Sequence, residues 1–100
     1  MRNAIATVEI FARRSGEATR RLTLVISSPE RSPAGGGWAC RLALADLHRA
    51  RSIEGPDSVA VLAGALAQAR GWLDELEASG FTLARDRAGE EPFRLDPVLE

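Results

Sequence analysis

The hydrophobic pattern of the chain changes period once, from two residues to between three and four. Apolar and polar residues alternate in residues 3–13, 19–28 and 38–46, which is typical of strands with one buried face. In residues 56–79 the apolar residues recur every three or four positions, as in an amphipathic helix. This change predicts an α+β fold, in which one long helix covers one face of an antiparallel sheet of three or four strands.

Turn-forming residues separate the predicted strands. Residues 15–18, Ser-Gly-Glu-Ala, predict a short hairpin turn, and residues 29–37, with two prolines and three consecutive glycines, predict a longer loop. A glycine-rich loop can hold a phosphate, but this one lacks the lysine and the following helix of a P-loop. Residues 46–54 fit neither period and predict a bend or bulge, followed by a short edge strand that ends at Ile53.

The predicted helix has capping residues at both ends. Pro56 suits the first helical position, and the side chains of Asp57 and Ser58 can accept hydrogen bonds from N–H groups of the first turn. Gly80 predicts the C-terminal stop. These roles account for the Gly-Pro-Asp-Ser sequence without catalytic chemistry, and they predict a helix from about residue 56 to residue 79.

The C-terminal residues complete the predicted fold. Residues 81–85 predict a short strand, and the tail is expected to dock as an extended segment through Phe93, Leu95 and Val98. One hundred residues form a single domain spanning residues 1–100, and a chain of this size is too small for a large enclosed active site. The phases of the strands and the helix predict a core of Val8, Ile10, Leu22, Leu24, Ile26, Trp38, Leu42, Leu44, Leu62, Leu66 and Leu73.

The composition points to a bacterial protein. All thirteen basic residues are arginine and 17 residues are alanine, which favours a GC-rich genome. Residues 1–51 hold nine arginines and four acidic residues, whereas residues 52–100 hold four arginines and ten acidic residues. The N-terminus lacks the apolar region of a signal peptide, and no segment approaches the roughly 20 apolar residues of a membrane span. With only one cysteine, these features predict a soluble cytoplasmic protein that does not bind membranes.

A short pattern runs through the middle of the chain. It consists of Trp-x-Cys at Trp38 and Cys40, Gly-x-Asp-Ser at Gly55, Asp57 and Ser58, and an alanine- and leucine-rich helix around Ala63 to Ala69. Over about residues 38–80 this pattern resembles small bacterial domains of unknown function. The resemblance implies a small fold of sheet plus helix, and it implies no activity, because such families carry none that is assigned.

Few residues are suited to catalysis. A nucleophile needs an activating base, and the only histidine, His48, lies in the irregular segment after the third strand. Asp46 lies two residues before His48 and is placed to orient the imidazole ring. In a regular strand Cys40 would lie on the same face as these two residues, but the expected bulge between Cys40 and His48 breaks that alignment. Cys40 also lies on the apolar face, where a free cysteine is usually a small buried hydrophobic residue. We therefore expect no catalytic residue, and keep a hydrolase that uses His48 as an alternative.

Metal and cofactor sites are not expected. One cysteine and one histidine do not supply the three or four nitrogen and sulfur ligands of a zinc site. The acidic residues Asp74, Glu75 and Glu77 near the helix end are interpreted as solvated charge.

A basic sheet face provides a second alternative function. Arg13, Arg21 and Arg41 share the predicted face opposite the helix, together with Phe11, and such a face can follow a phosphate backbone. The net charge of −1, the single aromatic residue and the absence of an RNA-binding signature disfavour nucleic acid as the partner. An arginine-bearing solvent face is the preferred interpretation.

The predicted helix is apolar over a wider arc than one small sheet covers. Beyond the predicted core stripe, Val61, Ala65 and Trp72 extend the apolar surface, and tryptophan is a typical interface anchor. These three residues predict an interface with a protein partner, which includes a second copy in a two-fold dimer; the C-terminal tail is the alternative cover. The expected function is a non-enzymatic interaction or regulatory module.

Overall fold

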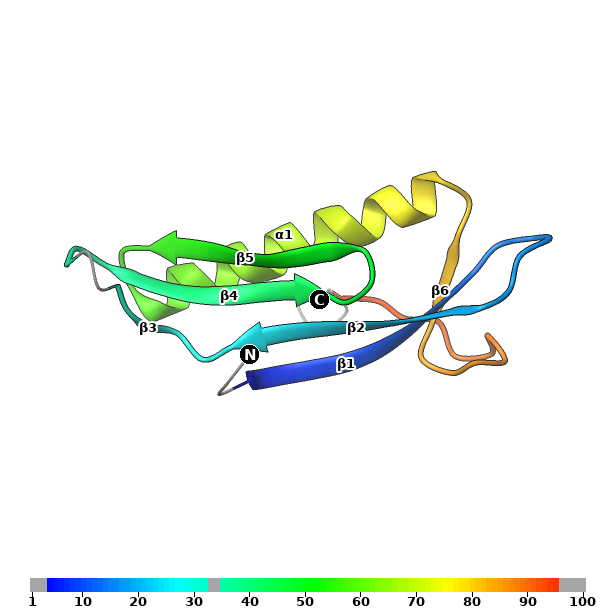
Figure 1. The fold of residues 1–100 in the computed structure, drawn as a ribbon, viewed down its shortest axis with the longest axis horizontal. Coiled ribbons are helices and arrows are strands. Elements are labelled where there is room, and N and C mark those ends of the chain that lie inside the picture. Colours follow the sequence, from blue (N-terminus) through cyan, green and yellow to red (C-terminus); the bar gives the residue numbers. More distant parts are fainter. Residues whose placement is uncertain (1–3, 33–34, 96–100) are drawn as a thin grey trace.

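In the computed structural model, residues 4–32 and 35–95 are described. Within these residues six strands form one antiparallel sheet, and a single helix packs on one of its faces, as Figure 1 shows. The predicted α+β class is confirmed, whereas the predicted number of three or four strands is too small. The elements in chain order are β1 (Ala4–Arg13), β2 (Arg20–Ser27), β3 (Glu30–Arg31), β4 (Trp38–Leu44), β5 (His48–Gly55), α1 (Ser58–Ala78) and β6 (Thr82–Ala84).

The sheet extends to both sides of the β1–β2 hairpin. β2 pairs with the C-terminal half of β4, and β5 pairs with the other side of β4, so β5 is an edge strand. β6 pairs with β1 at the opposite edge. The two-residue β3 lies within the predicted loop and pairs with the first residues of β4. It is separate from β2 because Pro29, between them, has no N–H to donate to a ladder.

Alternation in the strands places one sheet face in the core, as predicted. The buried residues of this face occupy every second position of β1, β2 and β4. Val8 and Trp38, two further predicted core residues, are half-buried and pack at its margin. The buried strand residues are Ile10, Ala12, Leu22, Leu24, Ile26, Cys40, Leu42 and Leu44.

The predicted orientation of the helix about its axis is wrong. Leu62 is only half-buried and Leu66 is 45% exposed, although both were expected in the core. At 100° per residue, the buried stripe is turned by about 60° from the predicted one. Alanines in the true stripe let the helix approach the sheet closely, and Trp72 buries more area there than a leucine would. The buried helix residues are Val61, Ala65, Ala69, Trp72 and Leu73.

The helix is capped at both ends, but it begins two residues later than predicted. Asp57 is the N-cap, and its Oδ1 accepts a hydrogen bond from the Ala60 N–H at 2.7 Å. Pro56 therefore precedes the cap, and Ser58 is the first helical residue. At the other end Gly80, with φ of 98°, is the predicted glycine stop. The N–H groups of Gly80 and Phe81 donate to the carbonyls of Glu77 and Leu76, which completes a Schellman motif.

The β4–β5 connection contains the predicted bend and bulge. Asp46 has a φ of 76°, a left-handed conformation that aspartate tolerates better than most residues. The register of β4 with β5 shifts between Leu42 and Leu44, where β5 carries an extra residue. The edge strand that follows is longer than predicted, because it ends at Gly55 instead of Ile53.

The C-terminal segment closes the other end of the sheet. β6 is followed by a turn in which the Asp86 carboxylate accepts hydrogen bonds from the N–H groups of Glu90 and Glu91. Phe93 is then buried in the core, and Leu95 packs against it, in agreement with the predicted docking of the tail. Val98, the third residue predicted to dock, lies outside the described residues.

Candidate functional site

β5 is the longest strand edge that the described part of the chain leaves unpaired. The strand pairs with β4 along one side only, so alternate residues direct N–H and C=O groups outward without a partner strand. The opposite edge is covered in part, because β6 pairs with the last three residues of β1 and Phe93 donates its N–H to the carbonyl of Leu83 in β6 at 3.0 Å. Residues 4–10 of β1 also lack a partner strand on that side among the described residues, so the β5 edge is the longer of two places where this sheet can accept another strand.

The middle of β5 is open on both faces as well as along its edge. Arg49, Ala50, Arg51 and Ser52 are four consecutive exposed residues, although a strand covered on one face normally alternates. Arg51 lies opposite Leu42, on the face that packs against α1, yet its side chain remains exposed. The side chains of this segment are thus exposed on both faces of the strand.

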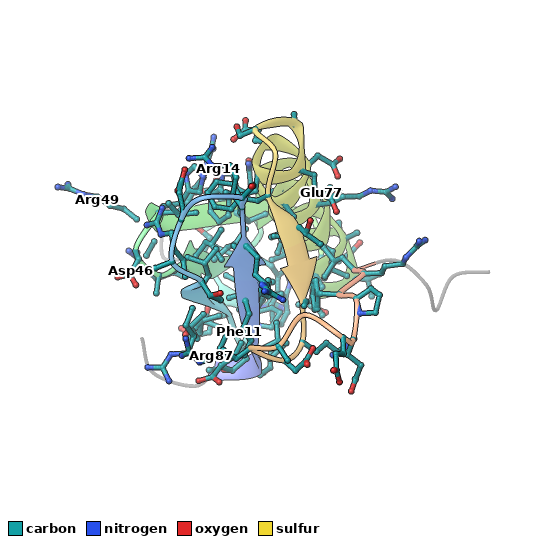
Figure 2. The ribbon with its side chains drawn as sticks, turned by 90° about the vertical axis from the view of Figure 1, so that its right-hand side faces the viewer. Phe11, Arg14, Asp46, Arg49, Glu77 and Arg87 are labelled. Atoms are coloured by element: carbon teal, nitrogen blue, oxygen red, sulfur yellow. The ribbon has the colours of Figure 1, made fainter. Side chains whose placement is uncertain are left out.

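The guanidinium groups of three arginines at this edge have no hydrogen bond, ion pair or ring contact within the described chain. Arg49 and Arg51 belong to β5, and Arg41 lies on β4 directly opposite Ser52. Figure 2 shows the Arg49 side chain extending away from the body of the molecule. Glu54 is the acidic residue of the same strand. The β5 edge is thus a basic strand whose guanidinium groups are available to an external anion.

Several arginines elsewhere are already occupied within the chain. Arg14 donates to the carbonyl of Ser79 at 3.0 Å and its guanidinium lies over the Phe81 ring. Three more arginines make cation–π contacts, in which the guanidinium carbon lies 5.0 to 5.3 Å from the centroid of an aromatic ring. Figure 2 shows one of these arginines, Arg87, beside Phe11. The arginines in these three contacts are Arg31, Arg85 and Arg87.

The predicted basic face is only partly open. Arg13, Arg21 and Arg41 do lie on strands at positions of the solvent face, but their surroundings differ. Arg13 donates to the carbonyl of Ala88, in the turn after β6, and Arg21 lies 3.8 Å from the carboxylate of Glu9. Phe11, the aromatic residue of this face, is half-buried under Arg87. Of the three arginines, Arg41 alone remains unoccupied in the described chain, and it lies next to β5.

The residues predicted to face a partner lie in the core instead. Val61 and Ala65 are fully buried and Trp72 is 5% exposed, because the sheet of the same chain covers them. This correction follows from the rotation of the helix. The large apolar side chains that α1 does expose are Val59 and Leu66.

His48 is held by packing and not by a catalytic partner. Its ring stacks on the Trp72 indole, with the centroids 4.3 Å apart and the planes within 5°. Cys40 pairs with Ile53, whereas His48 pairs with Leu44, so about 13 Å of strand separates the two residues. No hydrogen bond joins Asp46 to His48 in the described structure. Burial raises the pKa of the Cys40 thiol, which disfavours the reactive thiolate.

The hollows of the surface are shallow and lack a catalytic arrangement. The best defined is a groove of about 430 Å³ between the C-terminal half of α1, β6 and the tail, lined by both arginines and acidic residues. In residues 4–32 and 35–95 there is no cluster of three metal-ligating side chains, and every buried side-chain polar atom has a hydrogen-bond partner. No helix of this part of the chain is long and apolar enough to cross a bilayer.

Comparison with known proteins adds no family. The chain matches no protein-family model, no curated protein and no solved structure. The resemblance to small bacterial domains at Trp38, Cys40 and Asp57 therefore remains a prediction from the sequence. The function has to be inferred from the geometry of the fold itself.

Sequence reasoning found β5 but not its significance. The segment was predicted as a short edge strand, and Arg41 was assigned to the basic face, while Arg49 and Arg51 were not singled out. One signal was present, because "HRARSIE" alternates arginine with small residues next to a predicted edge. The decisive information is the pairing of β4 with β2 on one side and β5 on the other, which depends on contacts between distant residues.

Proposed function

We propose that this chain is a non-enzymatic interaction or regulatory module of the bacterial cytoplasm, which binds a protein partner by accepting a segment of it along β5. The observation that carries the proposal is the unpaired edge of β5, with Arg49 to Ser52 exposed. Strand addition to an open edge is a common mode of peptide recognition, because backbone hydrogen bonds supply affinity while side chains supply selectivity.

The packing of the sheet supports a rigid binding edge. β5 is anchored to β4 by paired residues from Trp38–Gly55 to Leu44–His48, and α1 packs on both strands. The His48–Trp72 stack fixes the first residue of the strand to the helix. A preorganised edge lowers the entropic cost of binding, because only the partner segment has to become ordered.

The chemistry of the remaining residues supports a role without catalysis. The candidate nucleophile Cys40 is buried, and the single histidine is separated from it along the sheet. A hydrolase that uses His48 remains the alternative from another class. This alternative predicts that the chain hydrolyses generic ester substrates and that the substitution His48→Ala abolishes the hydrolysis.

Selection of peptides on the folded chain tests the proposal. A random peptide library is displayed on phage and selected against the chain, and enriched peptides are synthesised and titrated into isotope-labelled protein. The proposal predicts that the amide resonances of β5 and the facing residues of β4 shift on binding. The proposal would be overturned if every enriched peptide shifted only amide resonances of residues outside β4 and β5. It would also be overturned if no peptide bound to the chain.

Self-association through the helix is a second proposal, supported by a separate observation. Val59 is 75% exposed and Leu66 is 45% exposed on α1, and burying such side chains is favourable. Sedimentation at micromolar concentration tests it, with the double substitution Val59→Ser and Leu66→Ser as the variant. A dimer that the variant dissociates supports this surface, and a monomeric parent protein excludes it.

A further inference from the structure

We infer that the segment bound along β5 is extended and acidic, so that its carboxylates contact Arg49 and Arg51 from the position of a seventh strand. This inference rests on the proposed function and adds the chemistry of the partner. The inference follows from three features of the edge, which are its positive charge, the repulsion that a second copy of the same strand would meet there, and its accessibility.

The charge of the edge selects the sign of the partner. Arg49 and Arg51 are exposed residues of β5, and Arg41 is an exposed residue of the neighbouring strand. None of them has a side-chain partner in the described chain, whereas Arg21 has Glu9 and Arg14 has Glu17. Opposite charges on neighbouring strands stabilise a sheet, and like charges destabilise it. Arg51 lies on the face toward α1 and Arg41 on the opposite face, so an added strand with carboxylates on both of its faces would match these guanidinium groups.

The same arginines disfavour a second copy of β5 as the occupant. In a two-fold antiparallel pair of β5 strands, Arg49 and Arg51 of both copies would share one short ladder. Like charges directly opposite each other destabilise a strand pair, so the two arginines disfavour a partner strand of the same charge. The edge is therefore suited to a different, acidic segment.

The edge is accessible to a strand and offers it more than charge. Both faces of β5 are open from Arg49 to Ser52, so side chains of an added strand have room on either side. The backbone N–H and C=O groups along the outer side form hydrogen bonds with a polypeptide in register. A nucleic-acid backbone lacks the matching amide groups, which makes a peptide the better fit to this surface.

Two synthetic peptides of eight residues, the length of β5, test the inference. Both combine threonine and valine with charged residues on each face of the extended peptide, and the charged residue is glutamate in one peptide and lysine in the other. Binding is measured by fluorescence anisotropy and mapped by amide chemical shifts. We expect the glutamate peptide to bind at β5 and the lysine peptide to bind at least about tenfold more weakly.

Charge exchange provides the decisive variant. The double substitution Arg49→Glu and Arg51→Glu should reverse the preference, so that the lysine peptide becomes the tighter ligand. Arg20→Glu is the control, since Arg20 is also exposed and lies at the start of β2, away from β5, and it should leave the preference unchanged. Circular dichroism and the unfolding temperature of each variant verify that its fold is intact.

The possible outcomes separate this inference from the proposed function. If the lysine peptide or an uncharged peptide binds best at β5, the partner is not acidic, although the edge is a binding site. If the glutamate peptide binds equally to the double variant, or if an oligonucleotide displaces it from β5 and binds there more tightly, the inference is overturned. If no peptide of any charge contacts β5 and selected binders map elsewhere, the proposed function fails as well.

Discussion

The imidazole of His48 lies flat on the indole of Trp72, with the ring centroids 4.3 Å apart and the planes within 5°. This contact joins the first residue of β5 to the C-terminal half of the helix, 24 positions later in the chain. Aromatic stacking of this kind contributes about 0.5–1.5 kcal/mol beyond the buried area. The contact gives the only histidine of the chain a packing role.

Substitution of His48 should therefore affect stability according to the shape of the new side chain. His48→Ala should lower the free energy of unfolding by about 1–2 kcal/mol, because it removes the stack and part of the buried surface. His48→Phe should retain most of the stability. Urea unfolding of both variants measures this difference, and equal stability of the two variants would contradict a packing role.

Substitutions of Asp57 and Ser58, at the start of α1, should differ in their effects on the free energy of unfolding. Asp57→Ala should cost about 1 kcal/mol, because the Ala60 N–H loses its acceptor. Ser58→Ala should change the free energy of unfolding by less than about 0.5 kcal/mol, since Ser58 is a helical residue and not the cap. Thermal unfolding of the two single variants measures both values. A larger loss with Ser58→Ala would show that the N-cap is misassigned.

Two glycines of the helix region should respond to alanine in opposite directions. Gly80 has a φ of 98°, so Gly80→Ala should destabilise the fold by about 1–2 kcal/mol. Gly71 is an exposed helical residue with open space where a Cβ would lie, so Gly71→Ala should stabilise it by about 0.5–1 kcal/mol. Denaturant midpoints of both variants provide the measurement. A loss of stability with Gly71→Ala would indicate that this helix face is covered.

The Cys40 thiol should be unreactive in the folded protein. It is 3% exposed on the core face of β4, and burial raises its pKa. A mild aromatic disulfide reagent should therefore label Cys40 at the rate of unfolding, and should label it immediately in denaturant. Fast labelling of the native protein at neutral pH would contradict this placement.

The turn after β6 should weaken in acid. The N–H of Glu91, followed by that of Glu90 and the charge of Arg13, lowers the pKa of Asp86. A lowered pKa means that the ionised carboxylate stabilises the turn above the pKa of an unfolded aspartate, and that this contribution is lost as the pH falls through the folded pKa. The protection factors of the Glu90 and Glu91 amides, which compare their exchange rates with those of an unfolded chain at the same pH, should therefore fall below about pH 4. Asp86→Asn should remove this pH dependence, and an Asp86 resonance that titrates at or above the pKa of an unfolded aspartate would refute the assignment.

The sequence predicted local features well and long-range relationships poorly. Alternation placed Ile10, Leu24 and Leu42 on the core face correctly, because the two-residue period depends only on backbone geometry. The helix was predicted in place but turned by about 60°, since the prediction followed the leucines, whereas alanines and a tryptophan form most of the stripe that meets the sheet. A hydrophobic period does not show which part of a wide apolar arc the sheet will cover.

The candidate site depended on the same long-range information. Whether β5 forms an edge is decided by the pairing of Leu42 with both Ile26 and Arg51, which no local pattern contains. The sequence also does not show which arginines are already bound within the chain. Arg13, for example, donates a hydrogen bond to the carbonyl of Ala88, 75 residues away. Arg13, Arg21 and Arg41 were therefore predicted as one basic face. Of these three, only Arg41 has a guanidinium group without a partner in the described chain, and it lies beside β5.

Amide hydrogen exchange along β5 tests the central claim most directly. In the free protein, alternate amides of His48 to Gly55 should exchange rapidly because they point away from β4, while the intervening amides are protected by the ladder. When a peptide selected on the folded chain, or the glutamate peptide, is bound, the rapidly exchanging amides should become protected. Binding that leaves these amides unprotected, or that protects amides outside β5 instead, would contradict strand addition at this edge.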